Sequence, residues 1–139
     1  MQELSTVEKG TRAEGAVLAA LLRCGYNVLI PFGPVRYDLV REKDGRFERI
    51  QCKTATLMKT GALRFALTNN PPSMTHKTYV GEIDFFGVYS PDLDKVYLVP
   101  IEVVASHKRE MWLRLEPSRN GQVSRTNLAE KFLLVPEAA

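Results

Sequence analysis

Apolar residues recur at helical spacing near the start of the chain, within a segment that is otherwise polar. Ser5 followed by Glu8 three residues later is typical of a capping box at a helix start. Gly25 stands where a glycine commonly ends a helix. The pattern therefore predicts a helix over residues 6–24. Its apolar stripe consists of Val7, Ala13, Val17, Leu18, Leu21 and Leu22.

The pattern then changes to short β-rich runs separated by turn residues. Asp44-Gly45 is a strong hairpin signal, so residues 35–40 and 47–54 are expected to pair antiparallel. The order helix, β-meander, helix predicts a mixed α/β sheet with helices packed on it. Further strands are predicted at 26–30, 63–67, 83–89, 95–99 and 111–115, with a short helix at 101–106 and a loop at 69–79.

Length and composition are those of an ordinary globular protein. The chain has 139 residues, of which 45% are hydrophobic and 25% charged, so we expect one domain over residues 1–139. Two cysteines make no disulfide framework. No signal-peptide pattern opens the chain, and no apolar stretch reaches the ~20 residues that span a bilayer. A cytoplasmic protein without a membrane partner is expected.

The charge balance is mildly basic and uneven. Lys and Arg number 19 against 16 Asp and Glu, and residues 1–60 hold 10 basic and 7 acidic side chains. This balance permits a nucleic-acid partner without establishing one, and places an anionic partner nearer the first half of the chain. Two histidines, and the absence of phosphate-loop, dinucleotide-binding and CxxC motifs, argue against zinc and nucleotide sites.

The candidate site lies on the two strands of the predicted hairpin. Side chains alternate along a strand, so Gln51 and Lys53 share one face while Cys52 points to the other. Counted from the Asp44-Gly45 turn, Asp38 lies opposite Gln51, with Cβ atoms ~5 Å apart. An acid, an amide oxygen and a lysine would thus converge. The alternative is a solvated strand face carrying a weak ion pair, but the apolar neighbours on both strands favour a functional role.

Together with Glu14 on the first helix, these residues resemble the PD-(D/E)xK nucleases. The resemblance covers most of residues 5–105, and segments 10–14, 50–55, 84–89 and 96–100 are similar to the branch of group I intron-encoded homing endonucleases. Archaeal Holliday-junction resolvases are similar more distantly. The resemblance implies a restriction-endonuclease-like fold, in which α-helices flank a mixed β-sheet core. It also implies metal-dependent hydrolysis of phosphodiester bonds in double-stranded DNA.

The resemblance further implies a role for each residue. Asp38 matches the first acid of the motif and would bind Mg²⁺ or Mn²⁺, with the Cys52 carbonyl in the same metal shell. Gln51 stands where the family usually has Glu or Asp, so it would bind the metal through an uncharged oxygen. Lys53 would orient or deprotonate water, or stabilise the negative charge that develops on phosphorus. Glu14 would support the metal directly or through water.

Basic residues around the hairpin and the following turns are candidate DNA contacts. The alternative is a solvated hairpin whose basic side chains pair with nearby acids such as Glu48. Asp84 is interpreted as a structural group, and Tyr79 as a residue that either bonds near the site or packs. The candidate contacts are Arg41, Lys43, Arg46, Arg49, Lys59, Arg64 and Lys77.

Other functions stay open at this stage. Because Gln51 brings no charge, a catalytically silent DNA-binding or assembly protein of the same fold is one alternative, and a junction-resolving nuclease is another. An α/β domain with a non-nucleic partner is a third. If the chain cuts both DNA strands, one active site per chain implies a homodimer or homotetramer.

Overall fold

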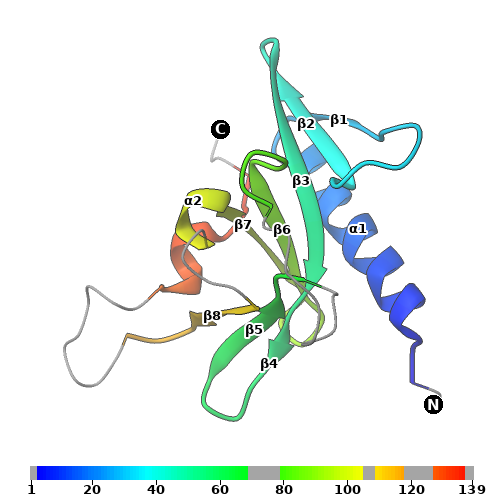
Figure 1. The fold of residues 1–139 in the computed structure, drawn as a ribbon. Coiled ribbons are helices and arrows are strands. Elements are labelled where there is room, and N and C mark those ends of the chain that lie inside the picture. The colour runs from blue at the N-terminus through cyan, green and yellow to red at the C-terminus, as the bar shows by residue number, and fades with distance from the viewer. Residues whose placement is uncertain (1–2, 69–78, 105–108, 118–126, 137–139) are drawn as a thin grey trace.

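The computed structural model describes residues 3–68, 79–104, 109–117 and 127–136, which form two sheets and a long N-terminal helix (Figure 1). None of the helices in these ranges is long and apolar enough to cross a membrane. The larger sheet has the order β1 (Asn27–Leu29), β2 (Leu39–Lys43), β3 (Arg46–Thr54), β6 (Phe85–Ser90), β7 (Lys95–Pro100). The smaller sheet has the order β4 (Thr56–Leu57), β5 (Ala62–Ala66), β8 (Glu110–Arg114). The helical elements are α1 (Thr6–Arg23), α2 (Ile101–Val104) and the 3-10 helix η2 (Ala129–Phe132).

Helix α1 begins and ends as its sequence predicts. The Ser5 hydroxyl accepts a hydrogen bond from Glu8 N at 3.2 Å, which satisfies a backbone donor of the first turn. Gly25 follows the helix with φ +85°, a left-handed conformation that glycine adopts without strain. Local chemistry at both ends thus fixes the length of the helix.

The hairpin is present, but its first strand was predicted too early. Asp44 and Gly45 both have positive φ, as a two-residue hairpin turn requires, and Lys43 pairs directly with Arg46. The ladder therefore runs up to the turn, and β2 is Leu39–Lys43. The predicted strand at 35–40 is wrong over residues 35–38, which belong to the loop that joins β1 to β2.

The predicted β-meander is also wrong in one respect. Strand β3 pairs parallel with β6, from Ile50 opposite Phe85 to Thr54 opposite Tyr89. Parallel neighbours need a crossover, and here the chain passes through β4 and β5 of the small sheet between them. The other predicted strands are present, with ends shifted by one or two residues. Strand β4 was not predicted. Residues 69–78 of the predicted loop lie outside the described ranges.

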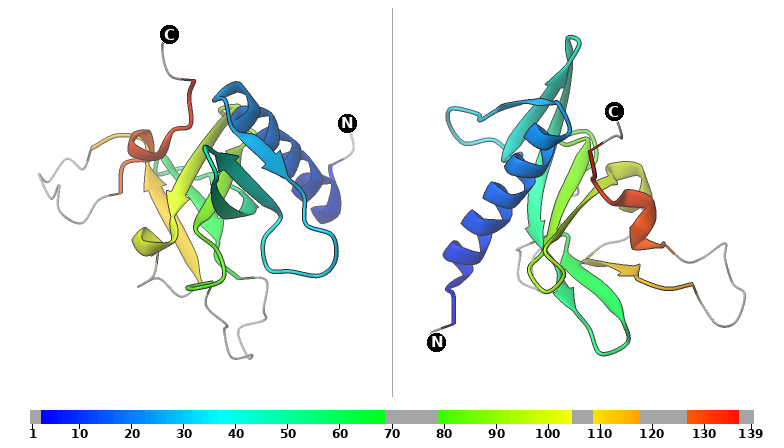
Figure 2. Two further views of the ribbon diagram at one scale, coloured as in Figure 1. Left: turned by 90° about the horizontal axis from the view of Figure 1, so that it is seen from above. Right: turned by 180° about the vertical axis from the view of Figure 1, so that it is seen from behind.

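The larger sheet is covered on both faces (Figure 2). Helix α1 packs on one face, where Val17 and Ile50 belong to one core. The small sheet and η2 lie on the other face, where Phe65 and Phe86 belong to a second core. Gly87 allows the close approach of α1, because a Cβ atom there would lie 2.8 Å from Val17 Cγ1. Residues of β3 therefore face either α1 or the small sheet.

Candidate active site

Gln51 and Lys53 lie on the face of β3 that points away from α1. Their parallel partners on β6 are Phe86 and Val88, and both of these belong to the core under the small sheet. Lys53 is only 8% exposed, which is unusual for a lysine. The alternation predicted from sequence therefore holds, and it places the ammonium at the edge of an apolar core.

Asp38 lies directly before β2 and is fastened to β3 by two hydrogen bonds. Its backbone N donates to Ile50 O at 2.9 Å, and its Oδ2 accepts from Cys52 N at 2.8 Å. The expected direct ladder pair with Gln51 is absent, since the regular pairing between β2 and β3 stops at Leu39 and Ile50. The Asp38 carboxylate instead contacts the backbone of Cys52, which lies between Gln51 and Lys53 on β3.

The acid and the lysine are both held in an environment that disfavours their charges. Burial raises the pKa of Asp38 above its ordinary value, although the bond from Cys52 N and the charge of Lys53 act against this. Burial lowers the pKa of Lys53, which Asp38 opposes and Arg36 reinforces. No described residue forms a direct ion pair with Lys53. Such perturbed groups, close together, are typical of functional sites.

Glu14 adds a second carboxylate from α1. Desolvation and the negative charge of Asp38 raise the pKa of Glu14. Burial raises the pKa of the Cys52 thiol, and the charges of Asp38 and Glu14 raise it further. The charge of Asp38 therefore disfavours negative charge on Glu14, and both acids disfavour it on the thiol. A cation between them would relieve this repulsion.

The residues present fit a divalent metal with hard oxygen ligands. Two carboxylates, the Gln51 amide oxygen and the Cys52 carbonyl suit Mg²⁺, which proteins commonly hold through one or two carboxylates. Within the described ranges, no three His, Cys, Asp or Glu side chains gather as a metal site. These candidate ligands carry less negative charge than three carboxylates would, because Gln51 stands at a position where the motif usually has Glu or Asp.

Comparison with known proteins identifies the family. A sequence model described as PD-(D/E)XK endonuclease matches residues 4–135. The chain belongs to the PD-(D/E)XK endonuclease family. Among solved structures, a bacterial homing endonuclease, I-Ssp6803I, is similar with a TM-score of 0.74 and 26% identity, over 94% of this chain and 89% of that chain. The search of curated proteins finds no match. The predicted resemblance and the restriction-endonuclease-like fold are confirmed.

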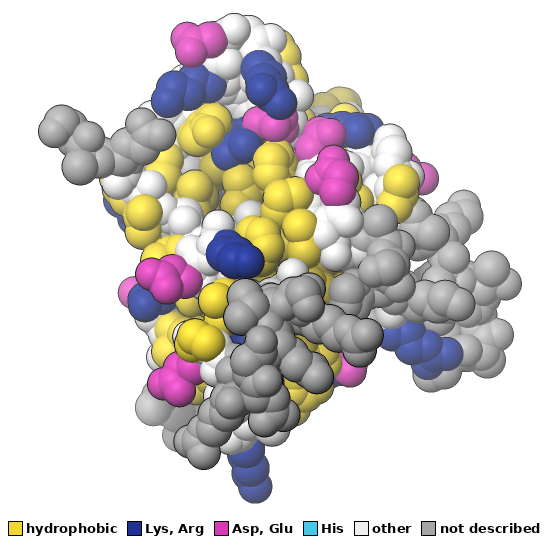
Figure 3. Space-filling model, turned by 90° about the vertical axis from the view of Figure 1, so that its left-hand side faces the viewer, with side chains coloured by type: hydrophobic (Ala, Val, Ile, Leu, Met, Phe, Trp, Pro, Cys, Tyr) yellow, Lys and Arg dark blue, Asp and Glu magenta, His cyan; other side chains and the backbone are white. Residues whose placement is uncertain are grey.

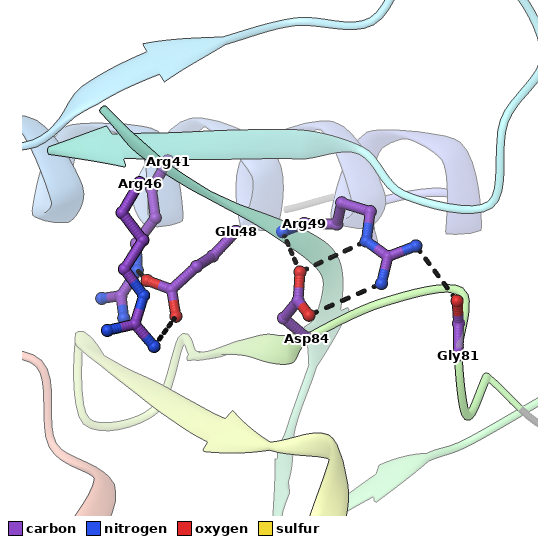
Figure 4. Close-up of polar contacts among 6 residues, drawn as sticks. All are labelled: Arg41, Arg46, Glu48, Arg49, Gly81 and Asp84. Carbon is purple, nitrogen blue, oxygen red and sulfur yellow. Dashed lines mark hydrogen bonds and ion pairs between the residues drawn. The ribbon is translucent and has the colours of Figure 1, made fainter. Parts of the chain in front are cut away.

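Most of the basic residues on the hairpin of this PD-(D/E)XK endonuclease are engaged within the chain (Figure 4). Arg41 pairs with Glu48 at 2.8 Å, and its side chain is only 11% exposed. Arg46 is 3.8 Å from Glu48, although its side chain is 82% exposed. Arg49 is held by Asp84 and by the carbonyl of Gly81. The hairpin therefore resembles the alternative of basic side chains paired with nearby acids, and DNA contact there stays a prediction.

The remaining candidate DNA contacts are scattered. Lys43 lies over the Tyr26 ring at 5.3 Å, Lys59 is exposed after β4, and Arg64 pairs with Glu110. Lys77 lies outside the described residues. On the side of the molecule shown in Figure 3, described Lys and Arg side chains are interspersed with acidic and hydrophobic ones. Basic side chains thus form no continuous stripe on that side.

Asp84 precedes β6 and is not embedded in the strand as predicted, but it bonds as a structural group would. Arg49 N donates to Asp84 Oδ2 at 2.7 Å, and Arg49 Nε donates to the same oxygen at 3.2 Å. Asp84 N donates in turn to Arg49 O at 2.9 Å. These bonds join β3 to the segment entering β6 at the point where parallel pairing begins.

Sequence reasoning missed Arg36 as a neighbour of the site. Its guanidinium carbon lies 4.0 Å from the centre of the Tyr79 ring, and Lys53 Nζ lies 5.7 Å from the same centre. Glu82 forms an ion pair with Arg36 Nε at 3.3 Å. The available signal was proximity in sequence, since Arg36 stands two residues before Asp38 in the loop that leads into β2. Tyr79 packs edge-on against Phe86 at 5.4 Å.

Proposed function

We propose that this PD-(D/E)XK endonuclease hydrolyses phosphodiester bonds of double-stranded DNA with Mg²⁺ or Mn²⁺, in the manner of a homing endonuclease. The observation that carries the proposal is the shared location of Asp38 and Lys53, with Glu14 approaching from α1. The similarity to a bacterial homing endonuclease supports the comparison with that class. We further propose that residues 1–139 act as one nuclease domain.

Four groups would hold the metal: the carboxylates of Asp38 and Glu14, the Gln51 amide oxygen and the Cys52 carbonyl. The hydrogen bond from Cys52 N to Asp38 Oδ2 orients the carboxylate. A divalent metal held there would lower the pKa of a bound water and would polarise a phosphoryl oxygen. Because PD-(D/E)XK nucleases generally use divalent metals, Gln51 is a variation in ligand charge rather than a different chemistry.

Lys53 supplies a fixed positive charge for the reaction. Hydrolysis forms one P–O bond to water and breaks one P–O bond to deoxyribose, while negative charge grows on the phosphate oxygens. An ammonium at 8% exposure is little screened by water, so its attraction for that charge is stronger than at the surface. The ammonium lies between the Tyr79 ring and the core residues of β6, which limits the positions that it can take.

A single chain offers one such site, so cutting both strands of a duplex would require two copies. We propose a homodimer or homotetramer for that reason, with double-stranded DNA as the partner. Basic side chains that remain exposed, such as Arg46 and Lys59, would contribute phosphate contacts at the rim.

The test is plasmid nicking with Mg²⁺, with a chelator as the negative condition. We expect Lys53→Met to slow cleavage about 10²–10³-fold, the usual cost of removing one group that stabilises the transition state. DNA affinity, measured with Ca²⁺ in place of Mg²⁺, should change by less than about threefold, since one phosphate contact carries little of it. Lys95→Met, at an exposed position that begins β7, is the matched control and should cut normally.

Two results would contradict the proposal. If the parent protein binds DNA but never cuts it with Mg²⁺ or Mn²⁺, it is a silent DNA-binding protein. If it cuts equally well with a chelator present, the metal assignment is wrong. Cleavage confined to four-way junctions would shift the class from homing endonuclease to resolvase.

A further inference from the structure

We propose that Arg36 is a substrate-binding residue of this site and that it contacts a DNA backbone phosphate beside the one that Lys53 serves. The inference rests on the proposed function and adds a residue that lies outside the family motif.

The guanidinium lies beside the site. Its carbon is 4.0 Å from the centre of the Tyr79 ring, and Lys53 Nζ is 5.7 Å from the same centre. Two cations thus share one aromatic ring. Tyr79 is itself held by its edge-on contact with Phe86, which belongs to the core. The ring therefore holds both positive groups in the same neighbourhood before any DNA arrives.

This arrangement is unfavourable unless an anion binds between or beside the two cations. Arg36 and Lys53 both carry positive charge and both lie against the Tyr79 ring, and like charges near one another repel. The carboxylate of Asp38 is proposed as a metal ligand. Two like charges held close together by packing are typical of an anion-binding site, and the anion of a nuclease is a phosphodiester.

Glu82 orients the guanidinium without covering it. The ion pair joins Arg36 Nε to Glu82 Oε2 at 3.3 Å, and the guanidinium carries two Nη groups besides Nε. A guanidinium fork of this kind matches the oxygens of a phosphate and forms two parallel hydrogen bonds to it. The Arg36 side chain is 35% exposed, which leaves it accessible to a ligand as large as DNA.

Arg41 is a more enclosed arginine in the same chain and provides a comparison. It also stacks on aromatic rings, 4.4 Å from the centre of Tyr26 and 4.5 Å from that of Phe85. Its Glu48 partner is closer, at 2.8 Å, and only 11% of the side chain is exposed. Arg36 is more open, its ion pair is longer, and it lies beside Lys53. These differences indicate a ligand-binding role for Arg36.

The test compares Arg36→Met and Arg36→Lys with Arg23→Met, which removes the same charge from the last turn of α1. Single-turnover cleavage is measured at saturating DNA with Mg²⁺, and DNA affinity is measured with Ca²⁺ across KCl concentrations. Arg36→Met should cut about 10–100-fold more slowly and reduce the slope of log affinity against log salt by about 0.9, the value for one lost phosphate contact. Arg36→Lys should restore the slope but only part of the rate, because the fork is lost.

A structural role alone would lower the melting temperature and leave the salt slope unchanged, and this result would overturn the inference. If Arg36→Met does not fold, the same two measurements on Arg36→Gln decide the question. A parent protein that does not cut DNA would instead defeat the proposed function. A parent that cuts normally, with Arg36 variants unchanged in rate and slope, would defeat only this inference.

Discussion

Arg49 and Lys53 lie four residues apart on the same face of β3, and each has an aspartate beside it, but the two neighbourhoods are opposite in character. Asp84 meets Arg49 through backbone and side-chain hydrogen bonds. Although burial acts to raise it, the bonds and charge of Arg49 hold the pKa of Asp84 below its ordinary value. Asp38 forms no such direct pair with Lys53, and its pKa is raised by burial.

The difference separates a structural pair from the pair that we propose to act in catalysis. The Arg49–Asp84 pair satisfies its own charges and joins β3 to the chain entering β6. Around Lys53, the charged forms are disfavoured in the absence of other ligands, and a metal and a phosphate would relieve them. Sites that bind ligands often carry such local instability, which the rest of the fold offsets.

The largest expected effect is a difference in cleavage rate between variants of the two aspartates. Asp38→Asn keeps the shape of the side chain but removes the charge of a proposed metal ligand. We expect the cleavage rate to fall about 10³-fold or more, given the several kcal/mol that metal-ion catalysis supplies. Asp84→Asn should cut within about threefold of the parent at a temperature where it stays folded. Plasmid nicking with purified proteins, checked by circular dichroism, measures both.

Equal loss of cleavage in the two variants would show that the distinction is false. It would mean that Asp84 acts in the site, or that Asp38 acts only through the fold.

Stability should show the reverse order. Asp84→Asn leaves the Arg49 guanidinium with a weaker partner, so the free energy of unfolding should fall by about 1–3 kcal/mol. Asp38→Asn removes a charge that burial disfavours, so the protein should gain up to about 1 kcal/mol when no metal is present. Urea unfolding with a chelator measures both values. A loss of stability in Asp38→Asn would contradict the view that this carboxylate is strained by its surroundings.

The parts of the molecule that follow from local chemistry were predictable from sequence. The ends of α1 depend on Ser5, Glu8 and Gly25, and the hairpin depends on Asp44-Gly45, all within a few residues of the structure that they fix. Strand alternation also placed Gln51 and Lys53 on one face, whereas the predicted direct pairing of Asp38 with Gln51 is absent from the ladder.

Contacts between distant segments were not predictable in this way. Nothing in the spacing of Arg49 and Asp84, 35 residues apart, indicates that they meet. The parallel pairing of β3 with β6 depends on a crossover through β4 and β5, and a single sequence gives no register for it. Arg36 and Tyr79 likewise come together only because β6 returns beside β3. The orientation of Asp38 toward Cys52 N needed the structure for the same reason.

Gln51→Glu increases the difference between the two neighbourhoods, because it adds a negative charge to the proposed metal ligands. A third carboxylate should tighten metal binding, so cleavage should reach half its maximal rate at about tenfold lower Mg²⁺, since ligand charge is a main determinant of affinity in such sites. With a chelator present, the repulsion of the introduced carboxylate by Asp38 and Glu14 should lower the melting temperature, and Mg²⁺ should restore it. Cleavage against Mg²⁺ concentration and a thermal melt with and without Mg²⁺ measure the two effects. An unchanged Mg²⁺ requirement would remove Gln51 from the ligand set.

The smallest effect is a difference in how stability depends on pH, measured by urea unfolding with a chelator from about pH 3.5 to 7.5. The folded pKa of Asp84 is lowered, so its contribution is present above its unfolded pKa of about 3.9 and is lost as the pH falls toward the folded value. The parent's larger free energy of unfolding, compared with Asp84→Asn, should therefore become a smaller difference in acid.

The folded pKa of Asp38 is raised, so its contribution to stability is present below the unfolded pKa and is lost as the pH rises through the folded pKa. The parent and Asp38→Asn should have the same free energy of unfolding in acid, and the parent should be the less stable of the two toward neutral pH. Two difference curves that slope the same way would show that the fold acts on the two anions in the same direction, and the contrast between the neighbourhoods of Arg49 and Lys53 would then be lost.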